Sequence, residues 1–80
     1  MTRKQLEKHF KAYPDLVTVK DMQKMINMSE PTIFHMLKSP IIYSFVYEYF
    51  RYISKETFID YLLSEECYMR WGDIANKIFN

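Results

Sequence analysis

Apolar residues at the start of the chain recur at helical spacing. Thr2 followed by Gln5 has the form of a capping box, in which each residue can satisfy a free backbone N–H of the first helical turn. Leu6 and the apolar positions after it keep the helical period until Pro14, which cannot continue a helix. The pattern predicts a helix over about 3–13.

A second start signal and a sharp break follow. Thr18 opens another capped apolar pattern, which predicts a helix near 19–26. Asn27 stands where the chain must reverse, and Asn tolerates the left-handed conformation that ends many helices. Ser29 is expected to cap a third helix, so that the recognition segment covers about 29–38. Two helices joined by a short turn are therefore expected.

The periodicity changes in "IIYSFVYEYFRYI", where β-branched and aromatic residues dominate. This composition predicts two short strands, near 43–46 and 50–53, that form a hairpin. The turn between them is unusual, since "YEY" supplies none of the Gly, Asn or Asp that tight hairpin turns favour. A longer or distorted connection is an open alternative.

Helical spacing returns after the hairpin. Ser54 is expected to start a helix, and a last helix is predicted over about 65–79, with Gly72 weakening its middle. The fold class that follows is mainly α with a minor α+β character. The order helix, tight turn, helix, two-stranded hairpin and helix is that of a winged helix-turn-helix, here with extra N- and C-terminal helices. Residues 1–80 are expected to form a single domain, with its core unit at 18–63.

Composition and charge narrow the class of protein. The chain is 49% hydrophobic and 18% aromatic, which is enough to build a dense core in 80 residues and argues against disorder. The lone Cys67 cannot form an internal disulfide. The charged N-terminus does not resemble a signal segment. No apolar run is long enough for a membrane span. A cytoplasmic protein without a membrane partner is expected.

The charge is distributed unevenly along the chain. The formal net charge is +1, but residues 1–38 hold seven Lys or Arg against four Asp or Glu, whereas residues 39–80 hold four against six. A surface that faces phosphates would therefore lie mostly in the first half of the chain.

A family resemblance appears in "LVTVKDMQKMINMSEPTIFHMLKS" continued by "FRYISKETFIDYLL". This segment resembles the excisionase-like and mercury-resistance-regulator type of winged helix-turn-helix protein of bacterial mobile elements. The matching positions are Thr18, Val19, Ser29, Thr32, Ile33, Leu37, Lys38, Ser39, Ile53, Tyr61 and Leu62. The resemblance implies a small DNA-binding protein that assists recombination or regulates transcription, with a recombinase as a protein partner.

The chain departs from that family pattern at its basic positions. Glu30 and His35 stand where the recognition helix usually carries arginines, and Pro40 replaces a glycine. Residues 48–50 replace the usual glycine-arginine-arginine at the tip of the wing. Both basic contact surfaces are therefore depleted.

The candidate DNA contacts lie on three elements of the predicted fold. In the functional interpretation, the start of the second helix and Ser29 contact phosphates, the outward side of the third helix contacts bases, and the wing contacts the minor groove. In the plain interpretation the same residues are helix caps and solvated charges. The candidate DNA-binding residues are Thr18, Lys20, Ser29, Thr32, His35, Lys38 and Arg51.

The aromatic residues of the hairpin suggest a competing function. A two-stranded ribbon buries only one face on its own domain, so some rings between 43 and 52 are expected to be exposed. The alternatives are core packing, a protein interface and a DNA contact. In this second hypothesis the chain is a protein-interaction or dimerisation module with weak or no DNA binding. Its candidate interface residues are Tyr47, Tyr49, Phe50 and Trp71.

Catalysis has little support in the sequence. His9, His35 and Cys67 lack the spacing of metal ligands, and a single glycine does not make a phosphate-binding loop. We therefore expect no enzyme activity, no cofactor and no metal. The expected partners are double-stranded DNA, a recombinase or other protein, and a second copy of the chain.

Overall fold

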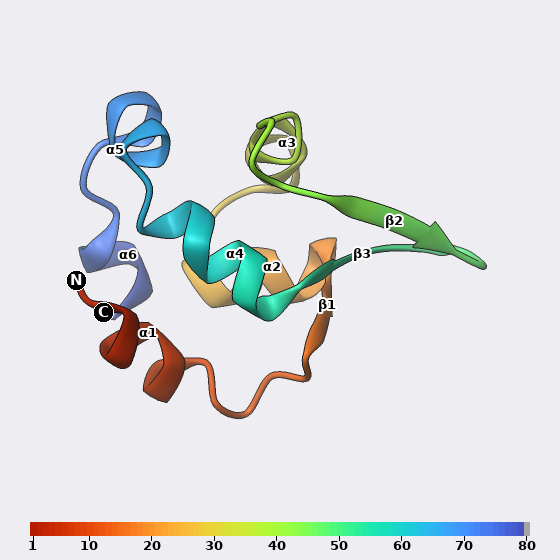
Figure 1. Ribbon diagram of the computed structural model, residues 1–80, viewed down its shortest axis with the longest axis horizontal. Helices are drawn as coiled ribbons and strands as arrows, with labels where there is room; N and C mark the ends of the chain where they lie inside the picture. Colours follow the sequence, from red (N-terminus) through yellow and green to blue (C-terminus); the bar gives the residue numbers. More distant parts are fainter. Residues whose placement is uncertain (80) are drawn as a thin grey trace.

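The elements of the fold are defined by a computed structural model, which describes residues 1–79 (Figure 1). About half of the residues are helical and the sheet is small, as in α+β proteins. The hairpin extends away from the helices, and the two ends of the chain lie near each other on the opposite side (Figure 1). The elements are α1 (Arg3–His9), β1 (Leu16–Thr18), α2 (Val19–Ile26), α3 (Glu30–Met36), β2 (Ser44–Tyr47), β3 (Phe50–Ser54), α4 (Lys55–Leu62), α5 (Glu65–Trp71) and α6 (Ala75–Ile78).

Both predicted capping boxes are present. The Gln5 backbone N–H donates to Thr2 Oγ1, and the Gln5 side chain accepts from the Thr2 N–H. At α2 the Asp21 N–H donates to Thr18 Oγ1 over 3.2 Å, while the Thr18 N–H donates to Asp21 Oδ2 over 3.0 Å. These local bonds fix where α1 and α2 begin.

Ser29 does not make the side-chain cap that its position predicts. It is the residue before α3, but its hydroxyl pairs with the hydroxyl of Thr32 at 3.0 Å instead of accepting from a backbone N–H. Ser29 therefore occupies the predicted cap position without the predicted bond, in contrast to Ser54, whose hydroxyl pairs with Thr57 Oγ1 and also accepts from the Thr57 N–H.

The corner between α2 and α3 is as predicted. Asn27 adopts the left-handed conformation, with φ 54° and ψ 49°, and its N–H donates to the carbonyl of Gln23. Met28 follows and is packed in part against the core. The sharp reversal places α3 beside α2 within three residues of the end of α2.

The sheet has a third strand that the sequence did not predict. It is antiparallel in the order β1-β3-β2, so the two-stranded prediction is corrected to three strands. Val17 pairs with Ile53, and both side chains are fully buried. The strand β1 was missed because three residues are too few to show an alternating pattern, and because Thr18 also caps α2.

The hairpin turn is tight in spite of its residues. Tyr47 pairs with Phe50, so that only Glu48 and Tyr49 form the turn. Glu48 has a φ of 56°, a left-handed conformation that is costly for a residue with a side chain. The longer connection is therefore not used, and the local strain is offset by the pairing of the strands.

The first helix is shorter than predicted. It ends at His9 instead of extending to Tyr13, and the Tyr13 N–H donates to the Phe10 carbonyl over 3.0 Å in a separate turn. The Lys55 ammonium donates hydrogen bonds to the carbonyl oxygens of Phe10 and Tyr13, over 3.3 and 2.8 Å. Pro14 disfavours a helical conformation for the residue before it and has no N–H to donate, and Lys55 satisfies carbonyls that would lack a partner at the end of a helix in any case.

The predicted helix over 65–79 is two helices. α5 ends at Trp71 and α6 starts at Ala75, because Gly72 adopts a φ of 75°. Asp73 Oδ1 then accepts from the Ala75 N–H over 3.0 Å. The glycine therefore breaks the helix instead of only weakening it.

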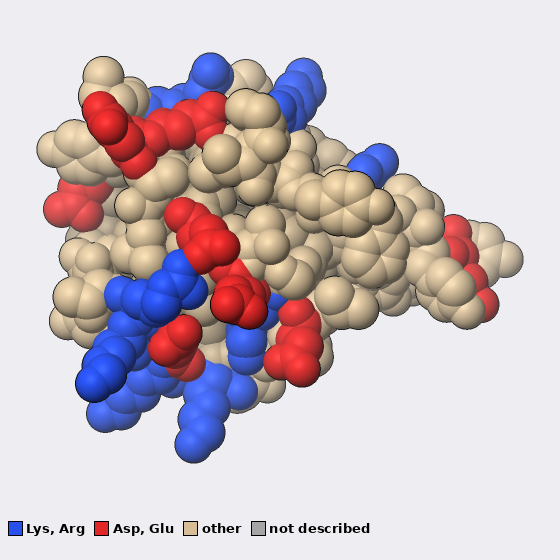
Figure 2. All heavy atoms as spheres, in the orientation of Figure 1, with Lys and Arg blue, Asp and Glu red and all other residues tan. Residues whose placement is uncertain are grey.

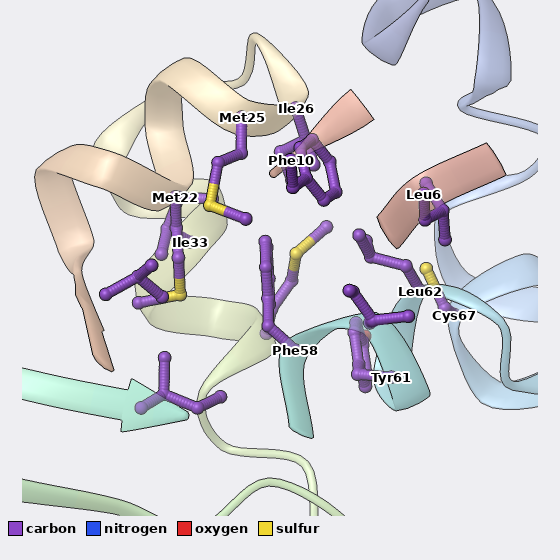
Figure 3. Close-up of a cluster of buried hydrophobic side chains, with 14 of the residues drawn as sticks. Leu6, Phe10, Met22, Met25, Ile26, Ile33, Phe58, Tyr61, Leu62 and Cys67 are labelled. Atoms are coloured by element: carbon purple, nitrogen blue, oxygen red, sulfur yellow. The ribbon is translucent and has the colours of Figure 1, made fainter. Parts of the chain in front are cut away.

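One hydrophobic core joins all of the helices. Figure 3 shows Phe58 of α4 in the middle, with Met22, Met25 and Ile33 on one side of it and Leu62 and Cys67 on the other. Burial raises the pKa of the Cys67 thiol to about 11, so it remains protonated near neutral pH and acts as a small apolar side chain. Within residues 1–79, every buried side-chain nitrogen and oxygen has a hydrogen-bond partner.

Thr18 and Ser29, the residues that precede α2 and α3, should contribute differently to the stability of the fold. Thr18→Ala should lower the free energy of unfolding by about 1 kcal/mol, because it removes an acceptor for a backbone N–H of α2. Ser29→Ala should change it by less than about 0.5 kcal/mol, because that hydroxyl bonds only another hydroxyl. Urea denaturation followed by circular dichroism measures both, and Thr18→Ser should restore most of the loss. Equal effects of the two alanine variants would contradict this assignment of the caps.

Candidate nucleic-acid interface

The outward side of α3 is open to solvent. Ile33 and Met36 point into the core, whereas Pro31, Phe34 and His35 are exposed. Thr32 is half-buried, and Lys38 lies exposed just beyond the end of the helix. The residues predicted for the outward side of the recognition helix therefore lie there.

A groove separates the start of α2 and the exposed side of α3 from the hairpin. Its volume is about 480 Å³. Lys20 lies on the helical wall together with Thr18, and Arg51 lies on the hairpin wall. Phe34 and Val46 contribute apolar surface to the same groove. The structure thus brings Thr18, Lys20 and Arg51 to one groove.

Arg51 is held on the side of the hairpin that faces this groove. Its Nη1 donates to Ser44 Oγ on the neighbouring strand over 2.9 Å, and Val46 is its direct cross-strand partner. Residues 44, 46, 51 and 53 share this face, because side chains alternate along a strand and directly paired residues point the same way. We call it the inner face of the hairpin.

The other end of α3 meets α5. Arg70 Nη1 lies 2.5 Å from His35 Nε2, and because a guanidinium can only donate, the imidazole nitrogen accepts. The His35 ring also meets the Trp71 ring edge to face, with 5.5 Å between the centroids. Arg70 is exposed, so α5 places a cation beside His35 and Lys38 without covering the middle of α3.

Sequence reasoning missed Arg70. Helical spacing places it on α5, but no pattern in the sequence indicates that this helix packs against the end of α3. The contact depends on how α5 packs against the end of α3, which the hydroxyl of Ser39 supports by donating to the Glu66 carboxylate. This interaction joins residues that are far apart in the sequence.

Trp71 is used within the molecule. It is half-buried, and its indole Nε1 donates to the hydroxyl of Tyr61 over 3.1 Å. Burial raises the pKa of the Tyr61 phenol above its usual value, although the bond from Trp71 acts in the opposite direction. The other predicted interface residues, Tyr47, Tyr49 and Phe50, are exposed on the hairpin. They lie on the other side of α3 from α5 and form no common surface with Trp71 (Figure 1).

Charges of both signs surround the site. Lys20, Arg51, Lys38 and Arg70 lie along it, and Glu30 lies in the groove. Figure 2 shows a denser group of basic side chains at the end of the molecule where α1 lies, mixed with acidic ones. Some of that charge is neutralised, because Arg3 pairs with both Glu7 and Asp60.

Comparisons with known proteins add no identification: no family, no curated protein and no solved structure matches the chain. Within residues 1–79, the structure brings no three His, Cys, Asp or Glu side chains together as metal ligands. In the same part of the chain, each helix is too short or too polar to cross a lipid bilayer.

The bond between Trp71 and Tyr61 can be tested with a matched pair of tyrosines. Tyr61→Phe should lower the free energy of unfolding by about 1 kcal/mol, because the indole N–H loses its acceptor in a half-buried position. Tyr68→Phe should change it by less than about 0.5 kcal/mol, since Tyr68 is 63% exposed. Urea unfolding followed by Trp71 fluorescence measures both values. Equal stability of the two variants would show that the bond does not hold α5 in place.

Proposed function

We propose that the chain is a small winged helix-turn-helix protein that binds double-stranded DNA, with α3 in the major groove. It would be a non-catalytic factor, similar to excisionases, that assists recombination or regulates transcription. The observation that carries the proposal is the exposed outer side of α3, which has cations at both of its ends.

The arrangement of elements supports the winged-helix interpretation. In such folds a helix, a tight turn and a recognition helix are followed by a hairpin that lies beside the recognition helix. Here α2, the left-handed corner at Asn27, α3 and the β2-β3 hairpin come in that order, and β1 ties the hairpin to the start of α2. The strand β1 therefore strengthens the interpretation, although it was not part of the prediction.

The size and exposure of α3 suit a major groove. The groove is about 12 Å wide and admits one helix. Thr32 and His35 lie on the side of α3 that would meet base edges, and His35 Nε2 would exchange its bond with Arg70 for one with a base or a phosphate. Phe34, which is 44% exposed, could contact a thymine methyl group.

The cations would contact the phosphates on both sides of that helix. Lys20 and Arg51 lie on the two walls of the groove at the start of α3, and Lys38 and Arg70 lie at its end. Arg70 replaces part of the positive charge that the recognition helix lacks. Four phosphate contacts would give a log–log salt dependence of about −3.6, so a single copy should bind weakly, in the micromolar range.

Glu30 opposes this attraction. A carboxylate at the entrance of a DNA groove repels phosphates unless it accepts a hydrogen bond from cytosine N4. It lies in the first turn of α3, where it also complements the helix dipole. We therefore expect Glu30 to reduce affinity for DNA in general and to favour sites that place a cytosine opposite it.

A salt titration with a charge-matched control tests the proposal. Duplex DNA from the genomic neighbourhood of the protein is titrated by fluorescence anisotropy at several salt concentrations. Lys38→Ala plus Arg70→Ala removes two of the proposed phosphate contacts, so the magnitude of the salt slope should fall by about two and the affinity at low salt at least tenfold. Lys4→Ala plus Lys8→Ala removes the same charge from α1, on a different side of the molecule from α3, and should leave both values nearly unchanged.

Two results would contradict DNA binding through α3. One is the absence of binding at low salt by the folded wild-type chain. The other is a larger loss in the α1 variant than in the Lys38 and Arg70 variant, which would move the phosphate contacts to the basic helix α1. Circular dichroism of each variant excludes unfolding as the cause.

A further inference from the structure

The aromatic rings of the hairpin gather on one face. Since directly paired residues point the same way, Phe45 and Tyr52 share a face, and Tyr47 and Phe50 continue it towards the tip. Tyr43, which precedes β2, stacks on Phe45 and extends the row towards the body. We call this the outer face of the hairpin, because Arg51 and Ile53 lie on the inner one.

The outer face is ordered by its own contacts. The centroids of neighbouring rings lie 6.5 Å apart for Tyr43 and Phe45, 5.9 Å for Phe45 and Tyr52, and 6.4 Å for Phe50 and Tyr52. Because each ring already packs against its neighbour, its side chain loses little rotational freedom when a partner covers it. A docking event would therefore carry a small entropic cost.

The outer face is uncovered and carries no charge of its own. Tyr43, Tyr47 and Phe50 are 76%, 64% and 56% exposed. Leu16 on β1, 46% exposed, points to the same side across the sheet, because it pairs with Ser54. Figure 2 shows the hairpin as a largely uncharged surface, with acidic atoms at its tip, where Glu48 lies.

The lack of charge decides which partner fits. Proteins that bind single-stranded nucleic acid combine stacking rings with cations along the backbone path, and this face has rings without cations. Acidic atoms at the tip would also repel phosphates. A neutral, apolar partner surface fits better, and the face of an identical hairpin is such a surface.

The exposed area agrees with a weak pair of identical chains. Each aromatic side chain can bury about 150–250 Å², so the exposed parts of these rings and Leu16 offer about 500 Å² per copy. Two copies would bury about 1,000 Å², the lower limit for a specific interface. The hairpin extends beyond the helices, so two hairpins can approach before the helical bodies meet (Figure 1).

We propose that the outer face of the hairpin packs against the outer face of a second copy, sheet on sheet, to form a symmetric dimer. In a symmetric dimer the same face meets itself across a two-fold axis, so the face must be complementary to its own copy. An uncharged row of rings meets this condition, because it brings no like charges together. The dimer leaves α3 and Arg51 free, and of the rings on the outer face Phe50 also lines the groove. The dimer itself does not depend on the proposed DNA binding.

Sedimentation velocity of the full chain without DNA tests the dimer, over about 5–500 µM. The wild-type chain should show a monomer–dimer equilibrium with a dissociation constant on the order of tens of micromolar. Tyr47→Lys places a charge on the outer face and should weaken association at least tenfold. Tyr68→Lys changes a tyrosine of nearly equal exposure, 63% against 64%, on α5 and should associate like the wild type.

Each other outcome overturns the proposal. If the wild-type chain stays monomeric at the highest concentration, the outer face does not pair with a second copy and the proposal is wrong. A dimer that Tyr47→Lys and Tyr43→Lys both leave intact uses another surface, and a dimer that Tyr68→Lys abolishes is held by α5. Tyr43 lies at the far end of the row from Tyr47, so the second variant serves if the first does not fold by circular dichroism. DNA binding is measured separately, so its failure leaves the sedimentation result unaffected.

Discussion

The burial of Ile53 and Phe58, five residues apart, is the constraint on which the rest of the molecule depends. Ile53 lies in β3, one residue before the strand ends, and Phe58 lies in α4 within the helical core; both are fully buried. A chain of this length can build only one core, so the strand and the helix that carry them must be joined without slack. Ser54 achieves this by pairing in the sheet and capping α4 through the Thr57 N–H. With this junction fixed, α3 is held between the hairpin and α5.

Local chemistry explains which parts of the fold could be predicted from the sequence. Thr2, Thr18 and Asn27 act within three or four residues, and the ends they define were predicted. The strand β1 was not, because Val17 becomes a strand residue only by pairing with Ile53, far along the chain. The same holds for the site. The exposed side of α3 follows from helical period, whereas the approach of Arg70 to His35 depends on packing between distant segments. Ser29 shows the converse, since a correct position did not guarantee the expected bond.

One strand, β3, serves two surfaces of opposite chemistry. Successive side chains of a strand point to opposite faces of the sheet. In β3, Arg51 and Ile53 therefore lie on one face, and Phe50 and Tyr52 lie on the other. The two functions proposed for the protein use different sides of this strand. Because Phe50 also lines the groove, the mutations that separate the two functions are those of Arg51 on one side and of Tyr43 or Tyr47 on the other. Together the two functions would let paired copies act on neighbouring DNA sites. Avidity of this kind is one way for a chain with few phosphate contacts to bind DNA usefully.

The left-handed conformation at Glu48 bears on how the molecule folds. Hairpins that nucleate by themselves rely on turn residues that favour the reversal, and a glutamate in this conformation opposes it. The ribbon should therefore order late, after Val17 and Ile53 have closed on the core, and its tip should open most often in the native state. Amide protons near Tyr47 and Phe50 would then exchange with solvent before those of the helices.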